Sequence, residues 1–385
     1  MDFRQRVREE LGAIEARGLR RRARRVEGPQ GPRLWVDGRY VIGLCSNNYL
    51  GLARHPALLS AMRDALDNEG LGSGASRQIS GSMRAHRQAE AALAQYVGQP
   101  ASVLFSSGYA CNVGVIQGLV ERGDIVFSDR LNHASLIDGA RLSRAEVVIY
   151  DHADPADLEQ KLRAHRARGR TALVVTESMF SMDGDVPAIA ELARLAREHE
   201  AGFVVDEAHA LGVLGSGGRG VCHSLGIVPD VLIGTLGKAF GSEGAFASGS
   251  DAVVDLLRQR SRSYVFSTAP AAPIAAVAVA AVKLVSEAEG LRETLRRHGK
   301  RLREGLRDLG YDVLRGEGPI IPVMVGEPGP TMELSRRLFE QGVFVHGVRP
   351  PTVPDGTGRL RVVPMASHTT EDIEDALQAF AEVAR

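Results

Sequence analysis

The chain has 385 residues, of which 47 are basic and 47 are acidic, so its formal net charge is zero. This balance excludes a protein whose main task is non-specific polyanion binding, and an apolar share of 44% is that of an ordinary soluble globular chain. The basic residues are almost all arginines, and the only lysines are Lys161, Lys238, Lys283 and Lys300.

The N-terminal residues 3–25 have the apolar spacing of an amphipathic helix that runs into a cluster of arginines. A solvated helix end explains most of these arginines, and an anion-binding role for one of them is the alternative. The segment is charged from its second residue and has no apolar core, so we expect no secretory signal. The widely spaced cysteines indicate neither disulfides nor a metal site, and no apolar stretch is long enough for a membrane span. We therefore expect a cytoplasmic protein.

From about residue 100, short apolar runs alternate with segments of helical spacing. Most runs are rich in β-branched residues and lack polar alternation, which is typical of strands buried on both faces. The alternation predicts a largely parallel sheet with helices on both sides. The last two runs are joined too closely for a crossover helix, so we expect the last strand to be antiparallel. The runs are SVLFS (102–106), DIVFS (124–128), EVVIY (146–150), ALVVTE (172–177), GFVVD (202–206), VLIGT (231–235) and GAFASG (244–249).

After Pro270 the pattern changes to that of a smaller α+β domain. A long helical segment (271–308) precedes short strands, and a final helix covers 370–384. The strands are expected around 312–314, 320–325, 343–346 and 359–363. The chain is thus predicted to form an N-terminal helix and arm (1–45), a large α/β domain (46–270) and a small C-terminal α+β domain (271–385).

Polar and titratable groups follow the strands of the predicted sheet, where ligands of open α/β folds bind. Ser107 and Gly108 open a helix, so they either cap it or hold an anion on free backbone N–H groups. For His133 a structural role is the alternative to a functional one. Asp206 ends a buried strand, where an acid is costly unless it is paired.

Lys238 is the most informative of these residues. It lies among glycines and apolar residues in GTLGKAFGSEG (234–244), directly after a predicted buried strand, whereas the other lysines lie in charged helical segments. Arginine stays protonated, but a desolvated lysine can lose its proton and form a Schiff base. Together with Asp206, His133 and the helix start at Ser107, this amine predicts a pyridoxal 5'-phosphate (PLP) site.

Competing motifs lack the context that they require. DEAH (206–209) resembles a metal-binding segment of nucleotide hydrolases, but the chain contains no phosphate-binding loop of the form G-x-x-x-x-G-K-[ST]. GSGGRG (215–220) matches a dinucleotide-binding pattern by letter, yet it does not lie between a strand and a helix.

Several segments in family order resemble the α-oxoamine synthases, which are PLP enzymes. The resemblance implies the fold-type I, aspartate aminotransferase-like architecture: a large domain with a mainly parallel seven-stranded sheet and a smaller α+β domain. The segments are SNNYLGL (46–52), GSGASRQISG (72–81), FSSGYACN (105–112), SDRLNHASL (128–136), TESMFSMDGD (176–185), VVDEAHALGVLGSGGRG (204–220), GTLGKAFGSEG (234–244), FSTAP (266–270) and RPPTVPDGTGRLRV (349–362).

The resemblance also implies roles for individual residues. Lys238 would bind PLP covalently and remove the α-proton of the amino acid, Asp206 would pair with the ring nitrogen, His209 with the ring oxygen, and His133 would stack on the ring. The further cofactor contacts implied are Ser107, Gly108, Tyr109 and Thr235 at the phosphate, Thr268 from a second subunit, and Ser181 near the ring oxygen. The substrate contacts implied are Arg361 for the amino-acid carboxylate, Arg20 and Arg349 for the far carboxylate of the acyl chain, His86 near the thioester, and Asn47 and Thr352.

The implied reaction is a decarboxylative condensation of an amino acid with an acyl thioester. The favoured substrates are L-alanine and pimeloyl-CoA or pimeloyl-ACP, which would give 8-amino-7-oxononanoate for biotin biosynthesis. The resemblance also implies a homodimer with its active sites at the subunit interface. No nucleic acid or membrane partner is expected. Ala210 and the segment VVPMASH (362–368) depart from the family pattern, so glycine C-acetyltransferase, aminolevulinate synthase, serine palmitoyltransferase and secondary-metabolite activities stay open. A catalytically silent scaffold and a DEAH-type nucleotide hydrolase are the alternatives from other classes.

Overall fold

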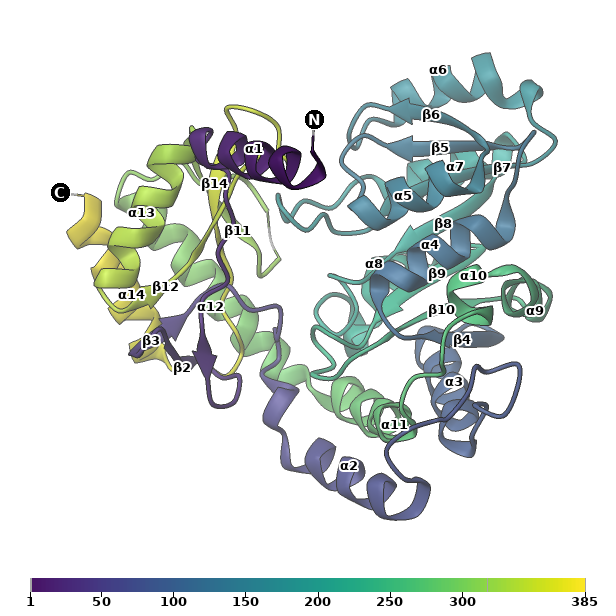
Figure 1. The fold of residues 1–385 in the computed structure, drawn as a ribbon, viewed down its shortest axis with the longest axis horizontal. Helices are drawn as coiled ribbons and strands as arrows, with labels where there is room; N and C mark the ends of the chain where they lie inside the picture. The colour runs from purple at the N-terminus through teal and green to yellow at the C-terminus, as the bar shows by residue number, and fades with distance from the viewer. Residues whose placement is uncertain (1, 317, 385) are drawn as a thin grey trace. The chain divides into compact units, whose positions relative to one another are not determined.

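The computed structural model describes residues 2–316 and 318–384, which form two compact units (Figure 1). Unit 1 consists of the N-terminal segment up to Asn47, residues 182–184 and the C-terminal segment from Thr294. Unit 2 consists of Asn48–Ser181 and Asp185–Glu293.

These bounds differ from the predicted domains in three places, one of which is the segment 182–184, predicted in the large domain but part of unit 1. The predicted N-terminal arm belongs to the smaller unit, because strand β3 (Arg39–Gly43) pairs with β12 (Val343–Phe344). Helix α11 (Ala272–Glu287) belongs to the larger unit, because it packs on α2 (Pro56–Glu69) and α3 (Arg84–Val97).

A seven-stranded sheet forms the centre of unit 2, in the order β4-β10-β9-β8-β7-β5-β6. Strand β10 runs antiparallel to both of its neighbours, and the other pairs are parallel. The mainly parallel α/β sheet with an antiparallel last strand is therefore confirmed. The strands are β4 (Ala101–Phe105), β5 (Ile125–Asp129), β6 (Glu146–Tyr150), β7 (Ala172–Glu177), β8 (Gly202–Asp206), β9 (Val231–Thr235) and β10 (Ala245–Gly249).

Helices cover both faces of this sheet (Figure 1). Successive strand residues point to opposite faces, so Val126 packs in one core cluster while Ile125 and Phe127 pack in the other. Both faces are buried, which is why the strand sequences are apolar throughout. One cluster includes residues of α4 (Gly108–Leu119), α5 (Ala134–Ser143), α9 (Asp251–Arg260) and α10 (Arg262–Val265), and the other includes α6 (Pro155–His165), α7 (Ile189–Glu198) and α8 (Gly220–Ser224).

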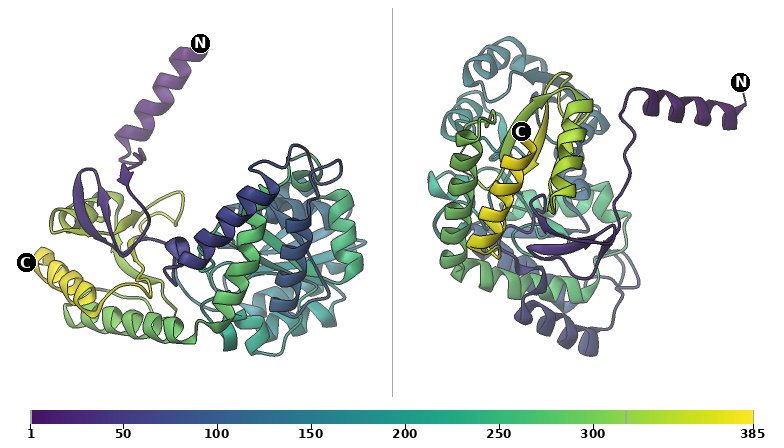
Figure 2. Two further views of the ribbon diagram at one scale, coloured as in Figure 1. Left: turned by 90° about the horizontal axis from the view of Figure 1, so that it is seen from below. Right: turned by 90° about the vertical axis from the view of Figure 1, so that its left-hand side faces the viewer.

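Unit 1 contains two small sheets, β1-β2-β3-β12 and β11-β14-β13, packed with helices (Figure 2). Its main apolar cluster joins residues of β11, β14, α12 and α14. Among the described residues, no helix has the length and apolar character needed to cross a membrane. The remaining elements of unit 1 are β1 (Val26–Glu27), β2 (Arg33–Val36), β11 (Ile321–Gly326), β13 (His346–Val348), β14 (Gly358–Val362), α12 (Glu289–Asp308, which begins in unit 2), α13 (Pro328–Glu340) and α14 (Thr370–Ala384).

Four predicted elements are shorter or divided in the structure. The strand expected at 343–346 is divided into β12 and β13, which belong to different sheets. The N-terminal helix α1 ends at Ala16 instead of residue 25, followed by Gly18 with φ +65° in the left-handed region. The predicted helix 271–308 is divided into α11 and α12, and the strand expected at 312–314 is a single bridge between Val313 and Val323.

A buried ion pair joins the glycine-rich loop at residues 72–81 to α3. The Glu90 carboxylate accepts hydrogen bonds from Arg77 at 2.8 and 3.1 Å and from the backbone N–H of Leu104 at 3.0 Å. Replacing Glu90 with Gln leaves the buried guanidinium without its counter-charge, so we expect a loss of about 3 kcal/mol in the free energy of unfolding. Urea unfolding measures this loss, with Glu159→Gln on the exposed face of α6 as the control; equal stability of the two variants would contradict the prediction.

Candidate active site

Lys238 and His209 are in direct contact in unit 2, as their predicted roles require. Nζ of Lys238 lies 2.9 Å from Nε2 of His209, and Nδ1 of the same ring lies 2.6 Å from the hydroxyl of Tyr49. Tyr49 is fully buried, and Lys238 is half-buried in the turn after β9. The three side chains form a continuous line of polar contacts that ends at the lysine amine.

Asp206 is buried at the carboxyl end of β8, and two donors fix its carboxylate. Oδ1 accepts the backbone N–H of Ala208 at 2.9 Å, and Oδ2 accepts the side-chain N–H of Asn112 at 2.8 Å. Asn112 also donates to Oγ of Ser135 at 2.8 Å, which orients the amide. A carboxylate offers about four acceptor positions, so Asp206 retains the capacity to accept a further N–H.

His133 is held at the start of α5 with its ring exposed. Its Nδ1 lies 2.7 Å from Oγ of Ser135, and its backbone N–H donates to Oε1 of Glu177 at 2.6 Å. Desolvation by the surrounding protein lowers the pKa of His133; the charge of Asp206 opposes this shift and that of Lys238 adds to it. The lowered pKa favours a neutral ring. Burial, together with the charge of Asp206, raises the pKa of Glu177 well above its usual range.

The N-terminus of the 12-residue helix α4 is arranged to hold an anion. Oγ of Ser107 accepts the N–H of Ala110 at 3.1 Å, which leaves the N–H groups of Gly108 and Tyr109 in the first turn for another acceptor. Open space lies where a Cβ of Gly108 would be, so a ligand can approach this backbone closely.

Two other residues predicted at the phosphate have contacts of their own. Oγ1 of Thr235 donates to the carbonyl of Gly244 at 3.0 Å and accepts from the N–H of Gly237 at 3.2 Å. Thr268 is exposed and forms a β-bridge with Ser76. Their contacts with phosphate, and the contribution of Thr268 from a second subunit, stay predictions, as does the role of Ser181 in the loop after β7.

The predicted substrate-binding arginines belong to unit 1, where a cavity of about 310 Å³ is lined by Arg349 and Arg361. Nη1 of Arg361 donates to Oδ1 of Asn47 at 3.0 Å, and Nη2 of Arg349 donates to the carbonyl of Arg20 at 2.8 Å. Burial, with the charge of Arg21, lowers the pKa of Arg349. The full lining is Arg21, Cys45, Met182, Phe344, His346, Gly347, Val348, Arg349, Thr352 and Arg361.

The side chain at this cavity is that of Arg21, whereas the sequence had suggested its neighbour Arg20. Arg21 donates to Oγ1 of Thr352 at 2.9 Å, while the Arg20 side chain is exposed and pairs with Glu15 at 3.1 Å. His86 is fully buried in unit 2; its Nδ1 accepts the N–H of Met83 at 3.1 Å and its Nε2 lies 2.7 Å from the carbonyl of Pro270. A role for His86 at the thioester stays a prediction.

Sequence reasoning missed Tyr49, Asn112 and Glu177. Each lies inside a segment already noted for its resemblance to the family, namely SNNYLGL, FSSGYACN and TESMFSMDGD. The signal was therefore present, but only the folded chain shows that these polar groups contact His209, Asp206 and His133.

The assembled residues fit PLP. Lys238 supplies an amine, Asp206 a buried carboxylate with acceptor capacity, His133 an exposed and uncharged ring, and α4 a helix N-terminus for the phosphate. Asn112 additionally has a buried Oδ1 to which the described residues offer no donor. No cluster of possible metal ligands is found in the part of the chain that the structure describes.

Comparisons with known proteins gave matches over nearly the whole chain. Residues 39–380 match the model of the family described as aminotransferase class I and II. The chain is 46% identical to an 8-amino-7-oxononanoate synthase of Geotalea daltonii and 48% identical to one of Geobacter metallireducens, each over 98% of this chain and 97% of the relative. A solved serine palmitoyltransferase of S. paucimobilis with bound PLP matches with a TM-score of 0.94 at 29% identity, over 100% of this chain and 99% of that one.

Proposed function

Because the chain belongs to the class I and II aminotransferase family and, within it, to the PLP-dependent α-oxoamine synthases, we propose that it condenses L-alanine with a pimeloyl thioester. The products would be 8-amino-7-oxononanoate, carbon dioxide and the free thiol, for biotin biosynthesis. The observation that carries this proposal is the 46–48% identity to 8-amino-7-oxononanoate synthases over nearly the full chain. A cytoplasmic homodimer that takes the acyl group from CoA or a carrier protein is part of the proposal.

The buried carboxylate of Asp206 would control the cofactor ring. PLP, when bound, supplies an electron-accepting ring that stabilises negative charge at the α-carbon of the amino acid. Asp206 would accept the N–H of the ring nitrogen and keep it protonated. The hydrogen bonds from Ala208 and Asn112 hold the carboxylate in one orientation, so little reorganisation is needed during the reaction.

The line from Tyr49 to Lys238 would prepare the lysine as a base. With the O–H of Tyr49 donating to Nδ1 of a neutral His209, the imidazole proton would reside on Nε2, the nitrogen that faces Lys238. A neutral amine at Lys238 would accept this N–H and could take the α-proton from the amino acid. With PLP bound, the same N–H of His209 would be directed at the ring oxygen.

Arg361 would bind the carboxylate of the amino acid as a planar, bidentate donor. Its contact with Asn47 fixes the guanidinium on the buried strand β14. Arg349 and Arg21 line the same cavity and would attract the far carboxylate of a dicarboxylic acyl chain.

Replacing Arg361 with Lys is expected to raise KM for the amino acid by roughly 10- to 100-fold, because a lysine cannot form the paired hydrogen bonds. The cofactor content of the enzyme should stay unchanged. Steady-state kinetics with varied amino acid measure the effect, and Arg336→Lys on the exposed side of α13 is the matched control. An unchanged KM would remove Arg361 from the binding site.

Product analysis tests the whole proposal. The purified enzyme with PLP is offered alanine, glycine or serine in combination with pimeloyl, succinyl, acetyl or palmitoyl thioesters, and products are identified by mass. We expect 8-amino-7-oxononanoate from alanine and the pimeloyl thioester. Serine with the palmitoyl thioester is the second candidate, because the fold matches a serine palmitoyltransferase with a TM-score of 0.94. Turnover with glycine alone would exclude both.

A further inference from the structure

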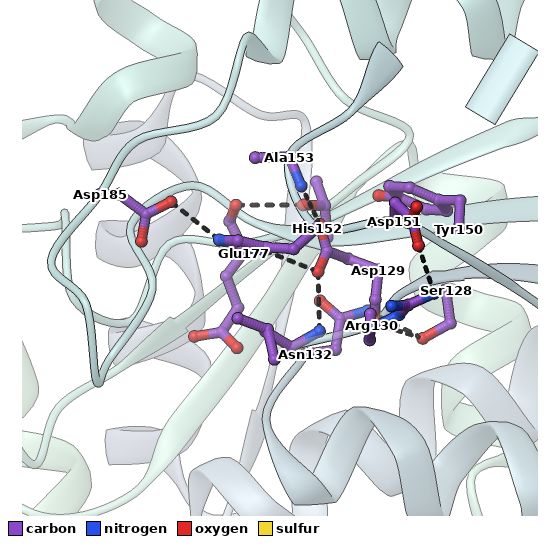
Figure 3. A network of polar contacts seen from close by, with 12 residues as sticks. Ser128, Asp129, Arg130, Asn132, Tyr150, Asp151, His152, Ala153, Glu177 and Asp185 are labelled. Carbon is purple, nitrogen blue, oxygen red and sulfur yellow. Dashed lines mark hydrogen bonds and ion pairs between the residues drawn. The ribbon is translucent and has the colours of Figure 1, made fainter. Parts of the chain in front are cut away.

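A histidine lies between two carboxylates at one edge of the unit 2 sheet, and the mechanism above does not use it. His152 follows β6, with Nδ1 2.9 Å from Oδ1 of Asp129 and Nε2 3.0 Å from Oδ2 of Asp185 (Figure 3). Each ring nitrogen thus faces a carboxylate oxygen. Because an ionised carboxylate can only accept hydrogen bonds, both nitrogens act as donors and the ring is an imidazolium.

Asp129 is the rigid side of this arrangement. It ends β5 and is buried, and it also accepts the N–H groups of Leu131 at 2.8 Å and Ala153 at 2.9 Å. The His152 ring packs edge-on against Phe180, with the ring centres 4.4 Å apart. A side chain with two polar contacts and one aromatic contact has little rotational freedom.

The electrostatics agree with this geometry. Burial alone would lower the pKa of His152, but the hydrogen bonds from its ring to Asp129 and Asp185 outweigh burial and raise the pKa to about 10. Arg130 and Asp151, which are also drawn in Figure 3, form an ion pair with each other. The raised pKa stabilises the fold fully below the ordinary value of 6.5, and this contribution is lost as the pH rises through about 10.

Asp185 is the loop side of this arrangement, because it closes a loop after β7. The backbone N–H of Phe180 donates to the carbonyl of Asp185 at 3.0 Å, so the two ends of the intervening segment are held together. Residues 182–184 of this segment belong to unit 1, where Met182 lines the arginine cavity and Asp183 pairs with Arg359. Arg359 precedes Arg361 by two positions on β14, so both side chains point to the same face of that strand.

We propose that His152 is a positioning residue that joins Asp129 to Asp185 and thereby fixes the C-terminal end of the loop that contains residues 182–184. Its effect on the reaction passes through Met182 and Asp183 to the cavity that receives the substrate carboxylates. The expected effect of His152 on substrate binding rests on the proposed function. Its expected effect on the order of the loop does not depend on that function.

The test compares His152→Gln and Asp185→Asn in the PLP-loaded enzyme with His223→Gln, an exposed histidine of α8, as the control. Hydrogen exchange of the peptide that covers residues 178–187 is expected to become at least about tenfold faster in the first two variants. KM for the substrates is expected to rise about tenfold while the cofactor absorption band and its binding constant stay as in the unaltered enzyme. The double variant should resemble either single one, because both changes break the same link.

Three results would overturn the proposal. These are unchanged exchange at 178–187 in both variants, a loss of cofactor binding with KM unaltered, and an NMR titration in which His152 is neutral at pH 8. If the unaltered enzyme does not condense alanine with the pimeloyl thioester, the proposed function is wrong. The hydrogen-exchange and NMR measurements then still test whether His152 positions the loop. Asp185→Asn is used instead of a change at Asp129, because Asp129 is buried and its replacement could prevent folding. Asp185 lies in a partly exposed loop.

Discussion

Replacement of Lys238 by arginine is expected to lower kcat by at least about 10³-fold while the fold stays intact. A guanidinium keeps its proton at any physiological pH and cannot form a Schiff base, so it can neither bind PLP covalently nor take a proton from the amino acid. The half-buried site should tolerate the change, because arginine and lysine side chains have a similar length. Two measurements check this: steady-state turnover, and borohydride reduction followed by peptide mass, which should show PLP attached to residue 238 in the unaltered enzyme only.

Lys300→Arg is the matched control, because its ammonium group lies on the exposed face of α12 and faces Glu304 across one helical turn. This variant should keep full activity and full cofactor attachment. If Lys238→Arg retained turnover within about tenfold of the unaltered enzyme, a lysine-bound cofactor would not be part of the mechanism.

Replacement of Asp206 by asparagine is expected to lower kcat by about 10²- to 10⁴-fold. The amide is nearly isosteric, and its oxygen can still accept the N–H of Ala208, but it cannot hold the ring nitrogen in its protonated form. The amide also places an N–H opposite the side-chain N–H of Asn112 unless one of the two turns over. Stopped-flow absorption with alanine alone should show that loss of the α-proton has become the slow step.

Asp255→Asn is the control for Asp206→Asn, since the Asp255 side chain is 75% exposed on α9. That change should leave both kcat and cofactor absorption as they were. An Asp206→Asn enzyme with unaltered kcat and a normal absorption band would mean that another group protonates the ring.

The sequence was sufficient to predict the central sheet and the residues at its edge, for two physical reasons. Strands buried on both faces must be apolar throughout, so the runs of β7 and β8 are visible without any other information. Parallel strands all end at the same side of the sheet, so Asp206 and Lys238, which follow different strands, could be expected near each other.

Other contacts of the site depend on tertiary structure that no local pattern encodes. Tyr49 and His209 are separated by 160 residues, and nothing near Tyr49 in the sequence indicates which histidine its hydroxyl contacts. Arg20 and Arg21 are neighbours in a segment without regular structure, so no periodicity distinguishes the side chain at the cavity from the one that faces Glu15. The role of His152 likewise depends on Asp129 and Asp185, which lie on two other elements.

The antiparallel strand β10 sets an order of events during synthesis of the chain. Strand β4, which leads into helix α4, where we propose that the phosphate binds, lies at the sheet edge and pairs with β10, and Ser102 and Ser248 meet across that pair at a separation of 146 residues. A nascent chain therefore has the proposed phosphate-binding helix long before it has the strand that fixes that helix in place. Ribosome-bound chains that end before β10 should be unable to retain PLP at α4, whereas chains that extend past Gly249 acquire the strand pairing that completes this part of the site.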